Sequence, residues 1–527
     1  MIISELAGRL SDARIAGDAP QNVDIKNIEI DSRSCRAGSI FACVRGYVLD
    51  GHDYAEKALE RGASALLTDD FTHLRAKVLL WERGFVQEDN ILWAGKLIPV
   101  IVVKNIRYAI AEIADVLCGH PSGKMNLIGI TGTKGKTTTS YMMRSILTAA
   151  GRESGLIGTI CNYIGSERVE TERTTPEANV IQPLLKRMVD AGIGDCVMEV
   201  SSQGLNLDRV GCCEFKVGLF TNLSRDHIGP TEHADMDDYA AAKAKLFGLS
   251  ENAVINADND WSDYMIGRAK ASVKERVYTF GMSENCNFRA DNVVTHQDSV
   301  EYDLHERGLF AGGNELPERT VHVIVPIPGR FTVYNSLGAY GAMRILGIGP
   351  EACVAGLSIV AVAGKAEVVP TGRDFTIIID YAHNPDSFIN ILTTVKEFAK
   401  RTVFLFGCGG DRNRPRALMG ETAGKYADFS IITSDNPRSE DPASIVADLE
   451  AGIKPTGAPY ICIVDRKEAI RWAITHAQPG DVIVLAGKGH ETYQILKDRT
   501  IHFDEREVVK EILEELRTGN EQLASNE

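Results

Sequence analysis

The sequence predicts an α/β protein with three domains: a small N-terminal α/β domain, a central parallel-sheet domain with a phosphate-binding loop, and a C-terminal Rossmann-like doubly wound domain. Its 527 residues are too many for one compact core. Short apolar runs alternate with helical stretches, an order that is typical of parallel sheets. Polar or glycine-rich motifs directly follow several of these runs, at the strand ends where parallel sheets bind their ligands.

The first domain is expected over residues 1–104. Apolar runs at 40–44, 63–69 and 98–103 predict short strands, and the segment 54–62 has the apolar spacing of a helix. This mixture predicts a small α/β unit.

The central domain is expected over residues 105–364. Its predicted elements are a helix at 107–122, a strand at 126–131, a glycine-rich turn, a helix at 136–151, and strands at 196–200, 216–223 and 253–258. A strand, a loop and a helix in this order indicate a parallel sheet with ligand sites at the carboxyl ends of its strands.

The third domain is expected over residues 365–527. Apolar runs at 375–382, 402–411, 429–435 and 482–489 alternate with predicted helices at 386–399, 417–427, 442–453 and 466–477. Polar motifs again come just past each strand. The pattern predicts a second doubly wound sheet.

The composition excludes some classes of function. Lys and Arg total 57 against 72 Asp and Glu, a net charge of −15, which argues against a general nucleic-acid or membrane-surface binder. An anionic ligand therefore needs a local positive site. With no run of 18 apolar residues and an N-terminal segment that becomes charged too early for a signal peptide, the chain is expected to be cytoplasmic without membrane insertion. A monomer is expected as well. The 11 cysteines include no CxxC pair, so reduced, mostly buried thiols are expected.

A glycine-rich loop follows the predicted strand at 126–131 and opens a helix. Backbone N–H groups of such a loop bind phosphate oxygens, a lysine neutralises them, and a threonine hydroxyl binds Mg²⁺. The spacing of the glycines departs from the strict P-loop pattern, and an ordinary capping turn is the alternative. The residues expected to bind ATP here are Gly132, Thr133, Lys134, Gly135, Lys136, Thr137 and Thr138.

Two further strand ends offer metal ligands. Glu199 ends the run at 196–200, and Asp226 and His227 follow the run at 216–223. Carboxylate and hydroxyl oxygens suit a hard cation that bridges phosphates, and a neutral imidazole can serve a second ion. Each residue taken alone is more often a helix cap or a satisfied polar group.

Short polar and glycine-containing motifs are spread along nearly the whole chain. They are DSR (31–33), DGH (50–52), GITGTKGKTTT (129–139), TERTTPE (171–177), MEVSSQGL (198–205), NLSRDH (222–227), YAAAKAKLF (239–247), DYAHNPD (380–386), FGCGGDR (406–412), SDNPRSEDP (434–442) and AGKGHETYQ (486–494). In this order and spacing they resemble the Mur ligase family of peptidoglycan synthesis, most closely the MurE type, which adds the third amino acid of the stem peptide.

The resemblance implies an ADP-forming amide ligase that uses ATP and Mg²⁺ to extend UDP-MurNAc-L-Ala-D-Glu in cell-wall biogenesis. ATP would turn the acceptor carboxylate into an acyl phosphate, which an amine then attacks. It implies that Lys136 and Thr137 hold phosphates and one Mg²⁺ together with Glu199, and that His227 holds a second Mg²⁺. Lys243 matches a family lysine that becomes N6-carboxylysine, an anionic Mg²⁺ ligand. Local sequence alone favours a solvated lysine there.

The resemblance also assigns the other ligand contacts. Residues expected at the UDP-muramyl peptide are Ser32, Tyr47, Val48, Leu49, Thr174, Thr175, Ser201 and Arg209. Residues expected to close over ATP through a hinge motion are Asn335, Asp380, His383 and Asn384. Residues expected around the incoming diamino acid are Arg412, Asp435, Asn436, Arg438, Gly487 and Glu491. From the residues alone, the threonines could be turn formers and Arg209 a surface ion pair.

Arg438 indicates which diamino acid is added. A guanidinium fork recognises the distal carboxylate of meso-diaminopimelate, which lysine lacks. The alternatives are that Arg438 pairs with Glu440 or Asp441, and that L-lysine is the substrate, since Lys134 and segment 228–236 resemble lysine-adding enzymes. Four positions depart from the family pattern: Arg173, Gln203, Thr332 and Lys365.

Three other functions remain as alternatives. A P-loop nucleotide switch or kinase would leave the DNPR and GKGHE motifs without a use. Folylpolyglutamate synthetase is the nearest other enzyme, but the DSR, DGH and DNPR segments favour the MurE type. A binding protein of ligase ancestry would be expected to lack the phosphate and metal residues.

Overall fold

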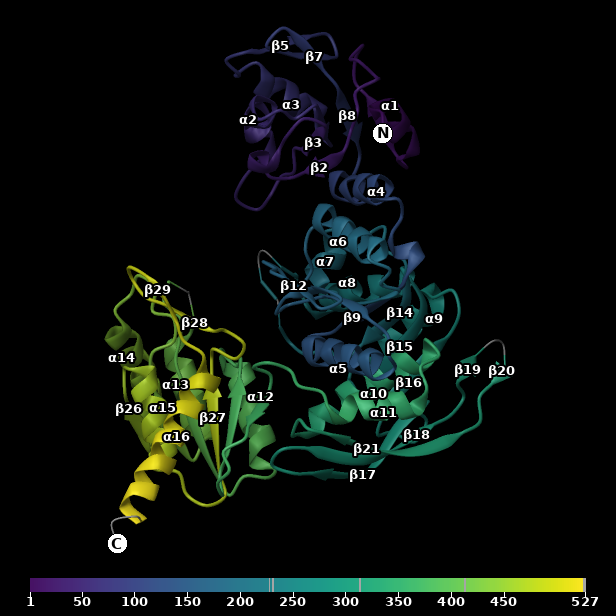
Figure 1. Cartoon of the computed structure of the whole chain (residues 1–527). Helices are drawn as coiled ribbons and strands as arrows, with labels where there is room; N and C mark the ends of the chain where they lie inside the picture. Colours follow the sequence, from purple (N-terminus) through teal and green to yellow (C-terminus); the bar gives the residue numbers. More distant parts are fainter. Residues whose placement is uncertain (227, 230–231, 312–313, 412–413, 525–527) are drawn as a thin grey trace. The chain divides into compact units, whose positions relative to one another are not determined.

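The computed structural model describes residues 1–226, 228–229, 232–311, 314–411 and 414–524 (Figure 1). The chain forms two compact units. Unit 1 comprises residues 1–287, 309–316 and 338–349, and unit 2 comprises residues 288–308, 317–337 and 350–527. Helices and mostly parallel sheets make up both units, so the predicted α/β class is confirmed.

The N-terminal part of unit 1 is a five-stranded sheet in the order β1-β8-β4-β3-β2. All neighbours are parallel except β1, which is antiparallel to β8. The strands are β1 (Ala13–Ile15), β2 (Asn27–Glu29), β3 (Ser39–Ala42), β4 (Ala65–Thr68) and β8 (Val100–Val103). Helices α1 (Ile3–Arg9), α2 (Ala55–Glu60) and α3 (Phe71–Val78), and an antiparallel sheet of β5 (Gly84–Gln87), β6 (Asn90–Trp93) and β7 (Lys96–Ile98), complete it. The predicted small α/β unit is present.

Helix α4 (Ile106–Cys118) follows and packs into the same core. The sequence predicted a helix at 107–122, which is four residues too long. Gly119 takes a left-handed conformation with φ 74°, and its N–H donates to the last turn of the helix. Pro121 comes two residues later and cannot continue a helix, so the chain turns away.

The central sheet of unit 1 has the order β12-β11-β10-β13-β9-β14-β15-β16. The strands from β10 to β16 in this order are parallel, and β11 and β12 form an antiparallel hairpin at the edge. The strands are β9 (Asn126–Thr131), β10 (Ser154–Ile157), β11 (Asn162–Ile164), β12 (Glu167–Val169), β13 (Asp195–Glu199), β14 (Phe215–Phe220), β15 (Ser250–Asn256) and β16 (Val277–Gly281). Strand β13 is buried throughout, as expected when helices cover both faces.

Five helices cover this sheet: α5 (Lys136–Ala149), α6 (Ala178–Asp190), α7 (Ser202–Asn206), α8 (Met236–Gly248) and α9 (Ser262–Ser272). Residues of α6 and α8 share one buried apolar cluster. Figure 1 shows α5 across the sheet from them. The order of strand, loop and helix predicted for this region is therefore confirmed.

One strand end differs from the prediction. Strand β14 ends at Phe220, so Asp226 lies in an exposed loop beyond the strand. The backbone leaves the sheet because Asn222 accepts a hydrogen bond from the N–H of Thr133 in the glycine-rich loop. His227 lies outside the described residues.

Unit 2 begins with antiparallel strands β17 (Phe288–Thr295), β18 (Val300–Glu306) and β21 (Arg319–Val325), which the sequence patterns did not single out. The hairpin of β19 (Phe310–Ala311) and β20 (Asn314–Glu315) belongs to unit 1. The boundary between the units falls inside α10 (Arg330–Ile345), and α11 (Pro350–Ser358) follows in unit 2.

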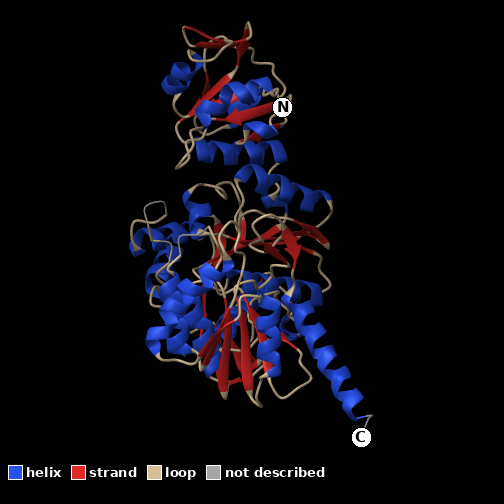
Figure 2. Ribbon diagram, turned by 90° about the vertical axis from the view of Figure 1, so that its left-hand side faces the viewer, coloured by secondary structure: helices blue, strands red, loops and turns tan. Residues whose placement is uncertain are grey.

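The C-terminal sheet has the order β22-β23-β27-β24-β25-β26, and only β22 is antiparallel to its neighbour. Its strands are β22 (Glu367–Val369), β23 (Thr376–Asp380), β24 (Arg401–Phe406), β25 (Phe429–Ile432), β26 (Tyr460–Cys462) and β27 (Asp481–Ala486). The helices are α12 (Pro385–Lys396), α13 (Arg416–Tyr426), α14 (Pro442–Ile453), α15 (Arg466–Thr475) and α16 (Glu505–Ala524), with a hairpin of β28 (Tyr493–Ile495) and β29 (Thr500–His502). Figure 2 shows parallel strands between helices on either side, so the predicted doubly wound fold is confirmed.

Local sequence explains where these helices begin. Asn384, Asp441 and Asp465 each cap a helix by accepting a backbone N–H through the side chain. Pro385 and Pro442 then occupy first-turn positions, where a missing N–H costs nothing.

Two expectations from composition concern the whole chain. In the described segments, every helix is too short or too polar to cross a lipid bilayer. All eleven cysteines are free, and most are buried, as expected.

Candidate active site

The glycine-rich loop lies between β9 and α5. Gly132 has φ 151° and Gly135 has φ 85°, values that side chains disfavour. A Cβ atom at position 132 would lie 2.0 Å from the hydroxyl oxygen of Thr221. The amide of Lys134 donates to the Asn222 side chain at 3.0 Å, which fixes the loop to the segment after β14. Both glycines are therefore required by the shape of the loop.

Two lysines converge on one carbonyl oxygen of this loop. The Nζ of Lys136 donates to Gly132 O at 2.8 Å and to Thr133 O at 3.1 Å. The Nζ of Lys243, from α8, donates to the same Gly132 O at 2.9 Å and lies 4.4 Å from the centre of the Tyr239 ring. The tertiary fold thus brings together residues 111 positions apart.

Lys243 is 1% exposed, so the interpretation of a solvated helix lysine is wrong. Burial lowers its pKa well below the ordinary value, the charge of Lys136 lowers it further, and Asp226 opposes the shift. Such surroundings favour the neutral amine over the ammonium form.

Glu199 is fully buried at the end of β13, and both of its carboxylate oxygens are engaged. The hydroxyl groups of Thr137 and Thr159 donate to Oε2 at 2.9 and 2.8 Å, and the Thr159 N–H donates to Oε1 at 3.1 Å. A carboxylate with hydroxyl oxygens around it is the donor set that suits Mg²⁺. Thr137 and Glu199, both predicted metal ligands, therefore lie in direct contact.

A cavity of about 1310 Å³ opens beside the loop. All eight residues predicted for the UDP-muramyl peptide line it, together with Lys136 and Lys243: Ser32, Tyr47, Val48, Leu49, Thr174, Thr175, Ser201 and Arg209. Of these, Tyr47, Val48 and Leu49 are large apolar side chains that stand exposed to solvent. Such exposure is typical of a ligand-binding surface.

Arg209 is buried in the cavity wall instead of lying in a surface ion pair. Its Nη1 donates to Thr175 O at 3.0 Å, and its Nη2 lies 2.9 Å from Glu177. Burial lowers the pKa of the guanidinium, and Glu177 opposes the shift. The Nε is buried without a hydrogen-bond partner. The Nε–H of the Arg209 guanidinium is therefore a buried donor without an acceptor.

Thr175 and Ser201 have structural contacts as well. The Thr175 hydroxyl donates to Glu199 O at 2.9 Å, and Ser201 caps α7 by accepting the Gly204 N–H at 3.0 Å. These local contacts are compatible with the place of both residues in the cavity wall. Thr174 contacts the Thr159 hydroxyl at 3.0 Å.

Sequence reasoning missed several residues of this site. Lys57, Arg61 and Arg107, which were missed, line the cavity and contribute the local positive charge that an anionic ligand needs in an acidic protein. Arg33 of the DSR motif and Arg173, one of the four departures, line it too. Thr159 was also missed, although it follows β10, the neighbour of β13 in the parallel sheet. Its position just past a strand end was the available signal. Gln203, which departs from the family pattern, lines the cavity and donates to Glu232 at 3.5 Å.

In unit 2, four polar residues gather past the ends of β25 and β27. Lys488, fully buried, lies 3.5 Å from Asp435 and 3.6 Å from Glu491, and it donates to Asn436 at 3.2 Å. Asn436 donates to Glu491 at 2.8 Å. Burial raises the pKa of Glu491, while Lys488 opposes the shift. Lys488 was not predicted, although it stands inside the GKGHE motif.

Arg438 and Gly487 flank this cluster. Gly487 has φ 115°, and a Cβ atom there would lie 2.8 Å from the Asp435 carboxylate. In the described part of the chain, the Arg438 guanidinium forms no ion pair, and its Nε is buried without a partner. The alternative pairing is wrong, because Glu440 pairs with Arg416 at 2.8 Å and Asp441 caps α14. Arg412 lies outside the described residues.

The four residues expected to close over ATP have local roles. Asp380 accepts the backbone N–H groups of Ala366 and Ala382, and burial raises its pKa, while Lys365 opposes the shift. Burial lowers the pKa of His383. Asn384 forms a capping box at α12.

The fourth, Asn335, is buried in α10. Two of the four departures from the family pattern, Thr332 and Lys365, also belong to unit 2. Thr332 is fully buried in the same helix, and its hydroxyl donates to Pro328 O at 3.3 Å. The Nζ of Lys365 lies 4.9 Å from the centre of the Tyr381 ring.

A buried ion pair supports the strand ends of unit 2. Arg466 and Glu505 are both fully buried, 2.7 Å apart. The Arg466 guanidinium also donates to Ser434 O at 3.2 Å and to Ala486 O at 2.7 Å. These carbonyls immediately precede Asp435 and Gly487, so the pair holds the two cluster-bearing loops in register.

Comparison with known proteins agrees with these features. Three family models match consecutive segments: "Mur ligase family, catalytic domain" at residues 24–116, "Mur ligase middle domain" at 130–343, and "Mur ligase, glutamate ligase domain" at 364–489. A UDP-N-acetylmuramoyl-L-alanyl-D-glutamate–2,6-diaminopimelate ligase of Caldanaerobacter subterraneus subsp. tengcongensis is 43% identical over 94% of this chain and 96% of its own length.

Solved structures give the same result. A structure of a UDP-N-acetylmuramoyl-L-alanyl-D-glutamate–2,6-diaminopimelate ligase has a TM-score of 0.68 and 28% identity, and covers 98% of this chain and 99% of its own. A Mycobacterium tuberculosis folylpolyglutamate synthase complexed with ADP and AMPPCP is 18% identical with a TM-score of 0.56, and covers 72% of this chain and 91% of its own, so it shares the fold alone. From the matched models and the near full-length similarity, the chain belongs to the Mur ligase family.

Proposed function

We propose that the protein is an ATP-dependent ligase that joins meso-diaminopimelate to UDP-MurNAc-L-Ala-D-Glu with formation of ADP and phosphate. The observation that carries this proposal is the convergence of Lys136 and Lys243 on Gly132 O, at the wall of the cavity that Arg209 also lines. It supports the proposal because the cation proposed to bind phosphate, Lys136, and the buried Nζ of Lys243 contact the same oxygen. A nucleotide switch or kinase has no evident need for the second lysine.

The chemistry needs activation of a carboxylate. A carboxylate does not condense with an amine in water, so the γ-phosphoryl group of ATP is first transferred to the acceptor carboxylate. The resulting acyl phosphate is attacked by the amine, the C–O bond to phosphate breaks, and an amide and free phosphate result. Positioning and charge neutralisation supply most of the catalysis of such transfers.

In this proposal Lys136 leaves Gly132 O and neutralises the phosphates, while the loop amides bind their oxygens. Thr137 and Glu199 would hold Mg²⁺, and the oxygen-only donors around Glu199 suit that ion. When bound, Mg²⁺ supplies positive charge next to the transferred phosphoryl group. His227 is proposed as a ligand of a second Mg²⁺ by family resemblance alone.

Lys243 is proposed to react with CO₂. Its neutral Nζ lone pair forms a bond to the carbon of CO₂, one N–H proton leaves to solvent, and an N6-carboxylysine results. The low pKa of Lys243 supports this step, because an ammonium has no lone pair to react. The carbamate would convert the site from a cation and a neutral amine at one carbonyl into a cation and an anionic oxygen ligand.

The cavity is proposed to hold the UDP-muramyl dipeptide. Ser32 and the segment 47–49 would bind the uridine diphosphate, and Thr174, Thr175, Ser201 and Arg209 the peptide. The cations that line the cavity complement a diphosphate and a D-glutamate carboxylate. The unsatisfied Arg209 Nε is a donor for such an anion.

Arg438 is proposed to select meso-diaminopimelate. A buried guanidinium N–H without a protein partner is costly, and a second carboxylate on the amino acid would satisfy it. Asp435 and Glu491 would bind the ammonium groups of the amino acid. Lys488 neutralises part of the negative charge of these two carboxylates. L-lysine, which has no distal carboxylate, is the alternative substrate.

These assignments correspond to three functional domains, which we place at residues 1–104, 105–364 and 365–527. The first binds UDP-muramyl substrate, the second ATP, and the third the amino acid. The protein is proposed to act as a monomer in the cytoplasm, where UDP-linked precursors are made.

One assay tests the proposal. Purified protein with ATP, Mg²⁺ and UDP-MurNAc-L-Ala-D-Glu is given meso-diaminopimelate, L-lysine, D-alanine or no amino acid, and ADP and tripeptide are measured. We expect one tripeptide for each ADP and the highest kcat/KM with meso-diaminopimelate. Little ADP should form when the UDP-muramyl dipeptide or the amino acid is omitted. ADP release without tripeptide would overturn the ligase assignment and favour a nucleotide switch.

A further inference from the structure

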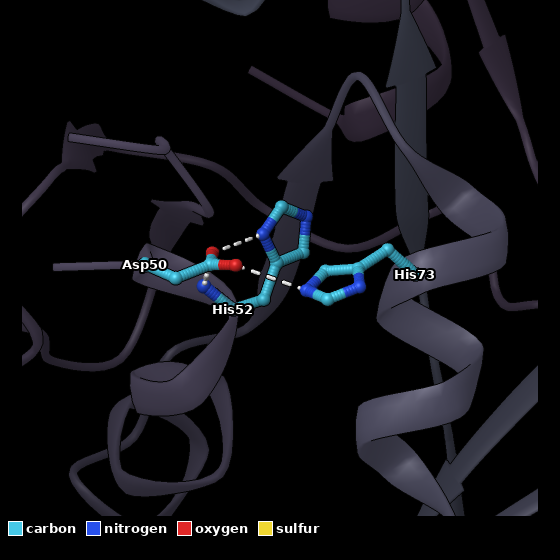
Figure 3. A group of neighbouring side chains, drawn as sticks. All are labelled: Asp50, His52 and His73. Atoms are coloured by element: carbon cyan, nitrogen blue, oxygen red, sulfur yellow. Dashed lines mark hydrogen bonds and ion pairs between the residues drawn. The ribbon is translucent and has the colours of Figure 1, made fainter. Parts of the chain in front are cut away.

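A group of three potential metal ligands lies outside the site described above, in the N-terminal part of unit 1. Asp50, His52 and His73 each offer one ligand atom, and these atoms lie within 4.8 Å of one another. Figure 3 shows the two imidazole rings side by side, each directed at the Asp50 carboxylate. The distances are 2.6 Å from Oδ1 to His52 Nδ1 and 2.9 Å from Oδ2 to His73 Nε2. Among the described residues, this is the one such group with two imidazoles.

The elements that carry these residues fix the geometry. Asp50 and His52 frame the start of the short 3-10 helix Gly51–Tyr54, where Asp50 accepts the His52 N–H at 3.0 Å. His73 lies in the first turn of α3, which Asp70 caps. A Cβ atom on Gly51 would lie 2.6 Å from Val44 N, so the backbone is closely packed where the group begins. The side chains are therefore held in place by two separate segments.

The charges of the group favour a cation. The Asp50 carboxylate supplies an acidic oxygen ligand within hydrogen-bond distance of ring nitrogens of both His52 and His73. One cation already lies nearby: Arg45 Nε is 3.6 Å from Asp50, although Arg45 also pairs with Asp70 at 2.9 Å. The contact between Arg45 and Asp50 is longer than the two histidine contacts, so the Asp50 oxygens interact mainly with His52 and His73.

His52 also has an outer partner. Its Nε2 lies 2.9 Å from the hydroxyl oxygen of Thr68, which accepts the Asp70 N–H at 3.0 Å. An aspartate, a histidine and a hydroxyl in a row resemble a nucleophilic relay, but His52 and Thr68 are both 0% exposed, so no substrate can reach the hydroxyl. The same contact instead suits a metal ligand, because a histidine that binds metal through Nδ1 needs an acceptor for its Nε2–H.

We propose that Asp50, His52 and His73 form a site for one divalent transition-metal ion, for which Zn²⁺ is the best match. Two imidazoles and one carboxylate are a common set of three protein ligands for Zn²⁺, with water in the fourth position. The ion replaces the protons that the two rings now share with the carboxylate. His73 is 30% and Asp50 25% exposed, so the fourth position can face solvent.

The site would connect two parts of the domain. Asp50 directly follows the exposed segment 47–49, which lines the cavity, and His73 belongs to α3. The same loop is closed by backbone hydrogen bonds between Gly46 and Leu49 and between Gly51 and Val44. An ion held by both segments would limit the motion of this loop and raise the stability of the domain.

The test is a Zn²⁺ titration of the metal-depleted full-length protein in excess Mg²⁺, followed by calorimetry. Zn²⁺ alone is the probe, and Mg²⁺ occupies oxygen-only sites. We compare the wild type with His73→Gln, chosen because His73 is partly exposed and its loss leaves the core intact. The matched control is His120→Gln: His120 makes a similar 2.6 Å contact with Asp115 but has no second imidazole.

The wild type and His120→Gln should each bind one Zn²⁺ at this site, with an increase in Tm on addition of the ion. In His73→Gln the affinity should fall at least about 100-fold, more than the loss of an outer partner causes. Asp50→Asn, a second variant that keeps the side-chain shape, should weaken binding similarly. No tight Zn²⁺ binding by the wild type, or equal binding by wild type and His73→Gln, would overturn the proposal. None of these outcomes depends on ligase activity.

Discussion

The two units each contain a buried lysine at a candidate site, and the two lysines differ in their neighbours. Lys243 in unit 1 is 1% exposed and is surrounded by a carbonyl oxygen, an aromatic ring and the charge of Lys136. Lys488 in unit 2 is 0% exposed and lies beside Asp435 and Glu491.

The different neighbours of the two lysines show that burial alone does not determine the chemistry of a lysine. Without a carboxylate in contact, burial lowers the pKa of Lys243 and favours its neutral amine form. With two carboxylates, Lys488 compensates charges that would otherwise be costly in the interior. One buried lysine is therefore a candidate for modification, and the other organises a binding site.

The largest expected effect comes from the cation that shares a carbonyl with Lys243. Lys136→Ala should lower kcat by about 10³–10⁴-fold, because a charge that neutralises the transferred phosphoryl group is lost. Tripeptide formation measures the loss, and thermal unfolding checks that the fold is intact. Near-normal ADP formation by the folded variant would contradict the phosphate-loop assignment.

Lys243 itself is tested next. Lys243→Ala should lower kcat by about 10²–10³-fold, and a small carboxylate such as acetate should restore part of the activity by supplying the missing anionic oxygen. Lys245→Ala is the matched control, since Lys245 lies on the same helix but is exposed. If both variants keep wild-type activity, the carbamate proposal is wrong.

The buried lysine of unit 2 should affect stability. Lys488→Met leaves Asp435 and Glu491 without their cation, which should cost about 3 kcal/mol of unfolding free energy. Chemical denaturation measures the change, with Lys497→Met, at an exposed position, as the control. An unchanged denaturation midpoint would mean that the carboxylates do not need Lys488.

Arg438→Ala tests the specificity of the same region. Losing a charge-assisted contact should raise KM for meso-diaminopimelate by about tenfold or more, roughly 1.5–3 kcal/mol, and leave KM for ATP unchanged. Arg438→Lys keeps the charge but not the fork, and should recover only part of the affinity. A wild type that prefers L-lysine would contradict this assignment directly.

The smallest effect concerns the cost of burying Lys243. Lys243→Met should raise the stability of the unmodified protein by about 1 kcal/mol at pH 7, opposite in sign to Lys488→Met. Because the folded pKa lies below the ordinary 10.5, the unfolded state binds the extra proton between the two values. Wild-type stability should therefore rise with pH in that window, and the variant should lack this rise. Parallel pH profiles for both proteins, measured without CO₂, would count against a lowered pKa.

The sequence by itself determined most of the fold. Periodic apolar runs and capping residues such as Asn384 and Asp441 act within a few residues, so helices α12 and α14 were predicted close to their observed bounds. The phosphate loop could also be predicted, because Gly132 and Gly135 are required by local backbone geometry. The end of α4 was misplaced because a single left-handed glycine decides it.

Only the tertiary structure decided how the site residues contact one another. Lys243 was indistinguishable from a solvated helix lysine in its own segment, and it is buried because residues 111 positions away, at the loop, lie against its helix. Thr159 binds Glu199 because β10 pairs with β13. Lys488 becomes the centre of a charge cluster because the segments after β25 and β27 come into contact, although β24 lies between these strands in the sheet. Burial and electrostatics depend on distances between segments, and a pattern along one chain does not contain those distances.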